Sequence, residues 1–228
     1  MRRNIARSIV PLTFAWWATT AVLFAQEPLP TPAAALERLK EGNARFAADR
    51  PVAKDQGSKR RAELARGQRP FAVIIACADS RVPPETIFDQ GLGDLFVIRL
   101  AGNVVDTAAI GSVEIAVGFF HVPLVVVLGH EECGAVQVAL DGKPFPGDLG
   151  RLLAMIHVGS RLPLGAKERL LAGIRANTVH QARELIRRSP EIKDFVDTER
   201  VRVVTGLYGL TSGKVQWLDW PPDKGRDR

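Results

Sequence analysis

The sequence predicts an α/β fold with a central, mainly parallel β-sheet flanked by helices. Short, continuous apolar runs are typical of strands buried on both faces, and helical patterns separate these runs along the chain. The runs are FAVIIA, LFVI, LVVVL and VRVV, at residues 71–76, 95–98, 124–128 and 201–204, and the last can extend to Tyr208.

Helical spacing marks the segments between and beyond these runs. The N-terminal AAALERLKEGNARFAADR has an amphipathic pattern, and so does AAIGSVEIAVGFF between the second and third runs. Residues 166–189 have the pattern of a long helix with a basic exposed face, and GKVQWLDW is a candidate edge strand. The residues expected on the apolar faces of the two shorter helices are Leu36, Leu39 and Phe46, and Ile110, Val113, Val117 and Phe120.

The composition is that of a globular protein. Of 228 residues, 46% are hydrophobic and 25% are charged, which excludes a disordered chain, a collagen-like repeat and a polytopic membrane protein. Two cysteines are too few for a disulfide-dense scaffold. The net charge of +6 includes three arginines at the N-terminus, and the modest excess on the rest gives no reason to expect a nucleic-acid partner.

The N-terminus has the pattern of a secretory signal. Arg2, Arg3 and Arg7 precede an uncharged stretch from Ile9 to Ala25, which is short for a spanning helix but suits the apolar region of a signal peptide. We therefore expect residues 1–25 to be a cleavable signal, which predicts a periplasmic or secreted protein. The alternative is an uncleaved anchor, the only case in which a membrane partner is expected.

One domain is expected after the signal, over residues 26–228. Residues 26–32 form a Pro-rich linker, and residues 33–66 are expected to be N-terminal helices that pack on the main body or on a partner subunit. There is no internal repeat or low-complexity tract.

Residues with metal-binding chemistry follow the first and third apolar runs directly. The first run leads into Cys-Ala-Asp-Ser-Arg (77–81), and the third into Gly-His-Glu-Glu-Cys-Gly (129–134). Because the carboxyl ends of parallel strands meet at one edge of a sheet, these groups should lie together. Two thiolates and an imidazole are typical zinc ligands, and three protein ligands leave a fourth position open, as in catalytic sites.

Two other interpretations of the cysteines remain open at this point, a disulfide and a structural metal. A disulfide explains neither the histidine three residues before Cys133 nor the Asp-x-Arg that follows Cys77, so catalytic zinc is favoured. The Asp79–Arg81 pair has a simpler alternative as a surface salt bridge.

The same motifs resemble those of the β-class carbonic anhydrases. The similarity rests on CADSRVP, on His-x-x-Cys-Gly about fifty residues later, and on GLGDLFVIRLAGNVV and VPLVVVLGHEECGAVQVAL around them. It covers roughly residues 33–218. It implies a β-carbonic-anhydrase-like fold and the zinc-dependent, reversible hydration of CO2 to bicarbonate and a proton, by attack of zinc-bound hydroxide on CO2.

The resemblance also implies roles for individual residues. Cys77, His130 and Cys133 correspond to the ligands of one Zn2+ per subunit. Asp79 and Arg81 correspond to a catalytic dyad in which the arginine holds the aspartate away from the metal. In a closed state Asp79 would become a fourth ligand.

Four further residues match substrate-binding positions of the family, namely Gln68, Phe96, Ala101 and Gly134. Gln68 would hydrogen-bond substrate, Gly134 would offer its backbone N–H to the bound anion, and Phe96 and Ala101 would line the CO2 pocket partly across a dimer interface. Ordinary packing or turn chemistry is the alternative for each. The implied partners are CO2 or bicarbonate and a second copy of the chain, as a homodimer or a dimer of dimers.

One feature of some family members is missing. Their regulatory bicarbonate site resembles a Trp-x-Gly-Cys pattern, whereas residues 74–77 read Ile-Ile-Ala-Cys, although Arg99 matches the site's arginine. We therefore expect the open form, with water on the zinc. Two alternative functions remain, a related zinc hydrolase acting on CS2 or COS and a non-catalytic zinc- or bicarbonate-binding protein.

Overall fold

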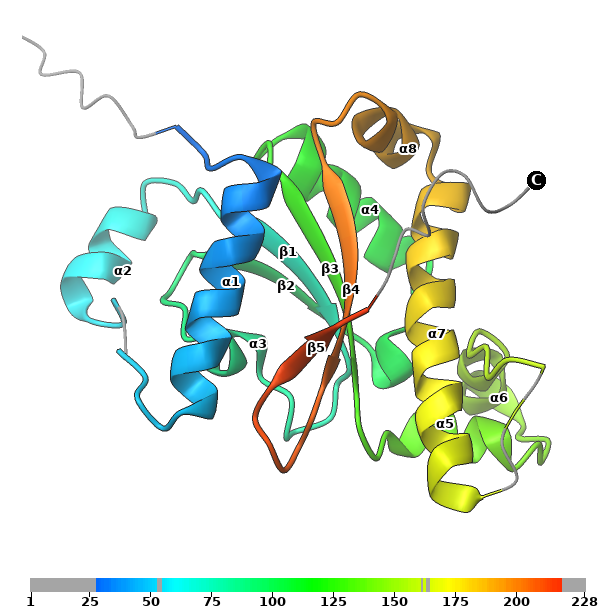
Figure 1. Cartoon of the computed structure of the whole chain (residues 1–228). Coiled ribbons are helices and arrows are strands. Elements are labelled where there is room, and N and C mark those ends of the chain that lie inside the picture. Colours follow the sequence, from blue (N-terminus) through cyan, green and yellow to red (C-terminus); the bar gives the residue numbers. More distant parts are fainter. Residues whose placement is uncertain (1–27, 53–54, 161, 163–164, 219–228) are drawn as a thin grey trace, which may run out of the picture.

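The fold is a five-stranded sheet between helical layers (Figure 1). The computed structural model describes residues 28–52, 55–160, 162 and 165–218, so the expected signal at 1–25 lies outside it. The elements are α1(Pro32–Ala47), α2(Ser58–Leu64), β1(Ala72–Ala76), α3(Pro84–Ile87), β2(Leu95–Arg99), the 3-10 turn η1(Ala101–Asn103), α4(Thr107–Gly118), β3(Leu124–His130), α5(Gly134–Leu140), α6(Gly147–Leu153), α7(Ala166–Arg188), α8(Pro190–Asp197), β4(Arg202–Tyr208) and β5(Val215–Trp217).

The strand order places β1 and β3 side by side near the middle of the sheet. The order is β2-β1-β3-β4-β5; the first four strands are parallel, and β5 pairs antiparallel with β4. Ala76 near the end of β1 lies opposite Leu128 of β3, so the two strands finish close together. The predicted α/β class with a mainly parallel sheet is confirmed, and so is the C-terminal edge strand.

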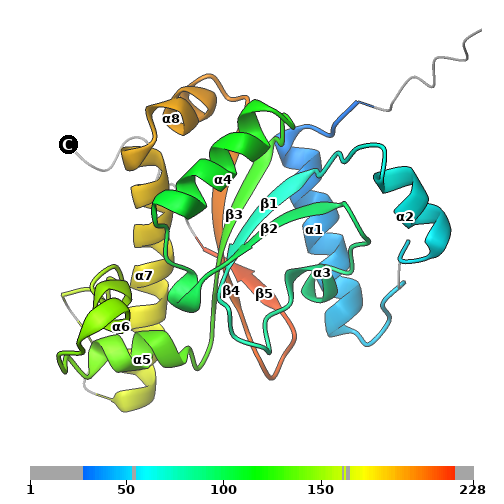
Figure 2. The ribbon, with the colours of Figure 1, turned by 180° about the vertical axis from the view of Figure 1, so that it is seen from behind.

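Both faces of the sheet are covered, which explains the continuous apolar runs. Successive side chains of a strand point to opposite faces. Ile74 and Val126 pack in the cluster that includes α1, whereas Val73 and Val125 pack in the cluster formed with α4, α7 and α8. Figures 1 and 2 show these two layers from opposite sides, with α1 over one face and α4 over the other.

The helix α1 packs tightly against the body of its own chain. Leu36 and Leu39 are buried in the cluster on this face of the sheet. At Gly42 the helix approaches the Phe88 carbonyl so closely that a Cβ atom there would lie 1.9 Å from the oxygen. Glycine is therefore required by the close approach of the two backbones.

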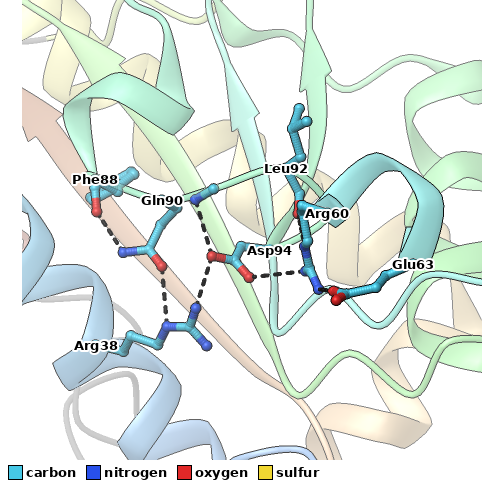
Figure 3. Close-up of polar contacts among 8 residues, drawn as sticks. Arg38, Arg60, Glu63, Phe88, Gln90, Leu92 and Asp94 are labelled. Atoms are coloured by element: carbon cyan, nitrogen blue, oxygen red, sulfur yellow. Dashed lines mark hydrogen bonds and ion pairs between the residues drawn. The ribbon is translucent and has the colours of Figure 1, made fainter. Parts of the chain in front are cut away.

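A network of arginine contacts also ties α1 and α2 to the segment before β2 (Figure 3). Arg38 of α1 donates to Gln90 Oε1 at 3.1 Å and to Asp94 Oδ2 at 2.9 Å. Arg60 of α2 donates to the Leu92 carbonyl at 3.0 Å and lies 3.7 Å from the other Asp94 oxygen. Asp94 thus links two helices to the strand that follows it.

The structure differs from the sequence expectation in three places. The run at 95–98 forms β2, an edge strand whose last four residues are only partly buried. The sequence did not predict this position, because an apolar run does not distinguish a central strand from an edge strand. The strand β3 continues to His130, beyond the end of the predicted run. The long helix stops at Arg188, because the Ser189 hydroxyl accepts from Ile192 N–H at 3.1 Å and caps the separate helix α8.

The helices at the carboxyl end of the sheet form a third cluster. Helix α5 starts directly after Cys133 and packs with α6 and α7 (Figure 1). This cluster contains both cysteines, Cys77 and Cys133. Across the described part of the chain, we find no helix with the length and apolarity that crossing a membrane requires.

Candidate functional site

Three metal-ligating side chains converge where β1 and β3 end. Cys77 follows β1 directly, His130 is the last residue of β3, and Cys133 is the N-cap residue of α5. Their ligand atoms all lie within 4.8 Å of one another, and all three residues are buried. Both cysteines are free thiols, so the structure contains no disulfide between them.

His130 is oriented with one ring nitrogen toward this cluster. Its Nδ1 lies 2.8 Å from the Glu131 carbonyl, and because a carbonyl only accepts, Nδ1 carries the proton. The Glu131 N–H in turn donates to the Tyr208 carbonyl at 2.9 Å, which fixes the turn to β4. In the neutral imidazole with its proton on Nδ1, Nε2 is the acceptor, and this atom is buried with no hydrogen-bond partner.

The two thiols share their protons unequally. The hydrogen bond with Cys133, more than the contact with His130, lowers the pKa of Cys77 to about 4 against the opposing effect of burial. The same contact, together with burial, raises the pKa of Cys133. The pair therefore loses one proton readily and holds the other until a cation competes for both sulfurs.

A cation is the group that this pocket fits. An acceptor nitrogen without a partner and two sulfurs in a buried cluster match the soft donor set of zinc, with bonds of about 2.0 to 2.3 Å. A buried polar atom is costly to leave unpaired, and coordination would satisfy Nε2 of His130. Cys77, His130 and Cys133 are the residues that would hold it.

Asp79 and Arg81 form a bidentate ion pair beside this cluster. Arg81 donates from Nε to Oδ1 at 2.9 Å and from Nη2 to Oδ2 at 2.8 Å, and its backbone N–H reaches Oδ1 at 3.0 Å. These bonds, the side-chain contact above all, hold the pKa of Asp79 well below its usual range. Arg81 Nη2 also donates to the Glu132 carbonyl at 3.2 Å, so this side chain connects the two loops that carry the sulfurs.

The side chain of Arg99 stabilises the loop after β1 by binding two of the loop's backbone carbonyls. Its guanidinium donates to the Cys77 carbonyl at 3.0 Å and to the Asp79 carbonyl at 2.5 Å. From the sequence, Arg99 matches only the arginine of the regulatory bicarbonate site, whose Trp-x-Gly-Cys pattern this chain lacks. Its contact with the loop could not be read from the pattern, because it depends on the register of β2 against β1.

The four expected substrate-binding residues are not all close to the ligands within one chain. Ala101 and Gly134 are, since Ala101 opens the turn whose Gly102 N–H donates to Cys77 Sγ at 3.3 Å, and Gly134 follows Cys133. Gln68 precedes β1 and is exposed, so it lies beyond the opposite end of that strand from the cysteine.

Phe96 is also distant from the edge that carries the ligands. It pairs with Val73 in the first half of β2, and its ring lies 6.2 Å from the ring of Phe120 in the α4 layer. Within one chain Phe96 therefore packs against the cluster on the α4 face of the sheet and does not reach the ligands.

The chain is similar to carbonic anhydrases over most of its length. A family model described as carbonic anhydrase matches residues 72–215. The carbonic anhydrase of Mycolicibacterium smegmatis is 42% identical over 197 residues, which are 83% of this chain and 94% of the relative. Carbonic anhydrase 2 of Mycobacterium tuberculosis is 44% identical over 199 residues, which are 84% of this chain and 95% of the relative.

Solved structures give the same result. The β-carbonic anhydrase CafA of Aspergillus fumigatus superposes with a TM-score of 0.63 at 27% identity, over 82% of this chain and 90% of the other. The Coccomyxa β-carbonic anhydrase in complex with acetazolamide has a TM-score of 0.63 at 27% identity, over 80% and 86% of the two chains.

We predict that His130→Ala loses stoichiometric zinc. The change removes the only nitrogen donor of the cluster and leaves two thiols, whose affinity for zinc should fall at least about tenfold. Metal analysis after dialysis against a weak chelator measures the loss. His121→Asn is the control, since this exposed histidine lies outside the cluster and asparagine tolerates its φ of 55°, so the variant should keep one zinc per chain. Equal zinc contents in the two variants would contradict the assignment.

Proposed function

This chain belongs to the β-class carbonic anhydrases, and from that premise we propose how its own residues catalyse the zinc-dependent, reversible hydration of CO2 to bicarbonate and a proton. The observation that carries the proposal is the meeting of two thiol sulfurs and an unpartnered imidazole nitrogen at one buried point. Cys77, His130 and Cys133 hold the zinc, which, when bound, supplies the Lewis acidity that lets water ionise near neutral pH.

Asp79 orients the attacking water. Both of its oxygens accept from Arg81, so the group is a carboxylate, which accepts hydrogen bonds and cannot donate them. A carboxylate beside the metal position selects the orientation in which the water O–H points toward it and an oxygen lone pair faces CO2. Arg81 binds both carboxylate oxygens, and Asp79 is not among the residues whose ligand atoms lie within 4.8 Å of one another, which supports the open form of the site.

CO2 hydration is favoured over the alternative functions. The relatives described above are carbonic anhydrases, which speaks for CO2 over CS2 or COS. A non-catalytic zinc- or bicarbonate-binding protein would have no need of the complete dyad, whereas Asp79 and Arg81 are both present and paired.

We predict that Asp79→Asn lowers the rate of CO2 hydration by at least about 100-fold while the protein keeps its zinc. The amide has the shape of the carboxylate, but it offers one donor group where the water needs an acceptor. Stopped-flow measurement of proton release, together with metal analysis, gives both quantities.

Asp148→Asn is the matched control for this prediction. Asp148 forms an ion pair with Arg151 at 2.7 Å, but both side chains are exposed and lie outside the ligand cluster. Its variant should turn over at the wild-type rate. Near-normal turnover in Asp79→Asn would remove Asp79 from the reaction.

The position of Gln68 supports a homodimeric active site. The strand β1 spans about 16 Å, so the Gln68 of one chain is far from the zinc ligands of that chain. A second copy can bring its own Gln68 to the site. Two features favour pairing with another copy. The outer edge of β2 pairs with no other strand among the described residues, and the apolar side chains Ile115 on α4 and Phe119 directly after it are exposed.

A mixing experiment tests whether Gln68 acts across the dimer. Gln68→Ala and Asp79→Asn chains should each be poorly active alone. In a mixed dimer, one site combines an intact Asp79 with the partner's intact Gln68, so random mixing should restore about a quarter of the wild-type activity. Activity equal to the mean of the two separate variants would show that Gln68 does not serve the neighbouring site.

We also propose that the protein is exported to the periplasm or secreted, with residues 1–25 as a cleavable signal. The support is the pattern of arginines followed by the uncharged stretch before Gln26. Mass spectrometry of the protein from a bacterial host should find a mature chain starting at Gln26 in the periplasmic fraction. An intact chain starting at Met1 in the cytoplasm would contradict export, and one in the membrane fraction would indicate an uncleaved anchor.

A further inference from the structure

We propose that Asn177 and Gln181, two buried side chains of α7, position the turn whose backbone N–H donates to the Cys77 sulfur, and thereby set how firmly zinc is retained. This inference rests on the proposed zinc site. The side-chain hydrogen bonds of both residues go to backbone groups near the turn rather than to the ligands, so both are positioning residues. Their effect passes through Gly102.

The turn that they hold has a left-handed backbone at two successive residues. Gly102 N–H donates to Cys77 Sγ at 3.3 Å, and Gly102 itself has a φ of 65°. Asn103 follows with a φ of 45°. Glycine and asparagine adopt this region more readily than other residues, so the sequence permits the turn, but it does not by itself fix where the N–H points. Contacts from outside the turn are needed to keep the N–H on the sulfur.

The two amides supply that support from the same face of α7. Asn177 Nδ2 donates to the Gly102 carbonyl at 2.8 Å, which fixes the peptide that follows the donor residue. Gln181 Oε1 accepts from Val105 N–H at 2.8 Å and so holds the exit of the turn. Gln181 Nε2 also donates to Asn177 Oδ1 at 3.0 Å, which links the two side chains into one unit. Their exposed fractions are 0% and 1%, so water does not compete for these bonds.

The same pair also holds the segment that packs on the other side of the turn. Asn177 Oδ1 accepts from His157 N–H at 3.1 Å, and Gln181 Nε2 donates to the Met155 carbonyl at 2.7 Å. Ile156 lies between these two anchored residues and packs against Gly102, where an added Cβ would come within 2.9 Å of the isoleucine Cδ1. The turn is thus held by hydrogen bonds to α7 and by Ile156 packed against it.

We expect the loss of these amides to change the affinity for zinc more than the stability of the fold. An N–H directed at a thiolate stabilises its negative charge and holds the sulfur in one orientation, and partners of this kind typically change metal affinity by about 10- to 100-fold. If the amides are removed, the Gly102 carbonyl and the exit of the turn lose these hydrogen bonds, so the turn can move and its N–H leaves the sulfur. Zinc should then dissociate faster from a protein that is still folded.

The test compares Asn177→Leu and Gln181→Met with Asn43→Leu. The first two changes remove the amides with little change of size. Asn43→Leu is the matched control, because it removes a buried amide of α1 whose hydrogen bonds go to the Ile87 and Gly213 carbonyls and to Val215 N–H, outside the ligand cluster. Release of zinc to a chromophoric chelator should be at least about tenfold faster in the two amide variants and unchanged in the control. Cobalt-substituted protein should show a shifted sulfur-to-metal charge-transfer band in the same two variants.

Release rates and bands equal to those of Asn43→Leu would overturn the inference, whatever the variants do to the melting temperature. A measurement on the unaltered protein covers the case in which the variants do not fold. With 113Cd in place of zinc, the Gly102 amide proton should show scalar coupling to the metal through the N–H···S bond, and absence of that coupling would overturn the inference. Unaltered protein that holds no zinc would refute the proposed function itself, whereas one zinc per chain with unchanged release would refute only the role of the amides.

Discussion

The parallel pairing of β1 with β3 is the constraint on which the rest of this structure depends. Because the two strands run in the same direction and stay in register to Ala76 and Leu128, their carboxyl ends deliver Cys77 and His130 to one point. Both strands lie inside the sheet and are covered on both faces, so little movement is available to either end. The backbone of the two strands thus sets the positions of the ligand residues, independently of the contacts that their side chains make.

Side-chain contacts then refine what the strands provide. Arg81 connects the Asp79 carboxylate to the Glu132 carbonyl, and Arg99 holds the carbonyls of the loop after β1. Hydrogen bonds orient two of the ligand side chains themselves, from Gly102 N–H to Cys77 Sγ and from His130 Nδ1 to the Glu131 carbonyl. These groups do different work: the strands fix where the ligands are, the arginines fix the loops, and the buried amides of α7 fix the turn that faces one sulfur.

The sequence predicted those parts of the structure that depend on local pattern. Apolar runs identified the strands, because buried parallel strands need apolar side chains on both faces, and two rare cysteines at strand ends identified the cluster. The pattern could not show that β2 is an edge strand, since strand order is a property of the tertiary fold. It also could not reveal the contact of Asn177 with Gly102, which joins residues 75 positions apart, or place Gln68 at the opposite end of β1 from the cysteine. Polar residues on an amphipathic helix are usually solvated, and nothing in the spacing marks these two as buried.

The most direct test of the central claim is X-ray absorption at the zinc edge of the purified, zinc-loaded protein. The account predicts two sulfur neighbours at about 2.3 Å and one or two nitrogen or oxygen neighbours at about 2.0 to 2.1 Å, with an imidazole scattering pattern. Such a shell would place Cys77, Cys133 and His130 on the metal together. A shell without sulfur, or protein in which the two cysteines form a disulfide and zinc is absent, would contradict it.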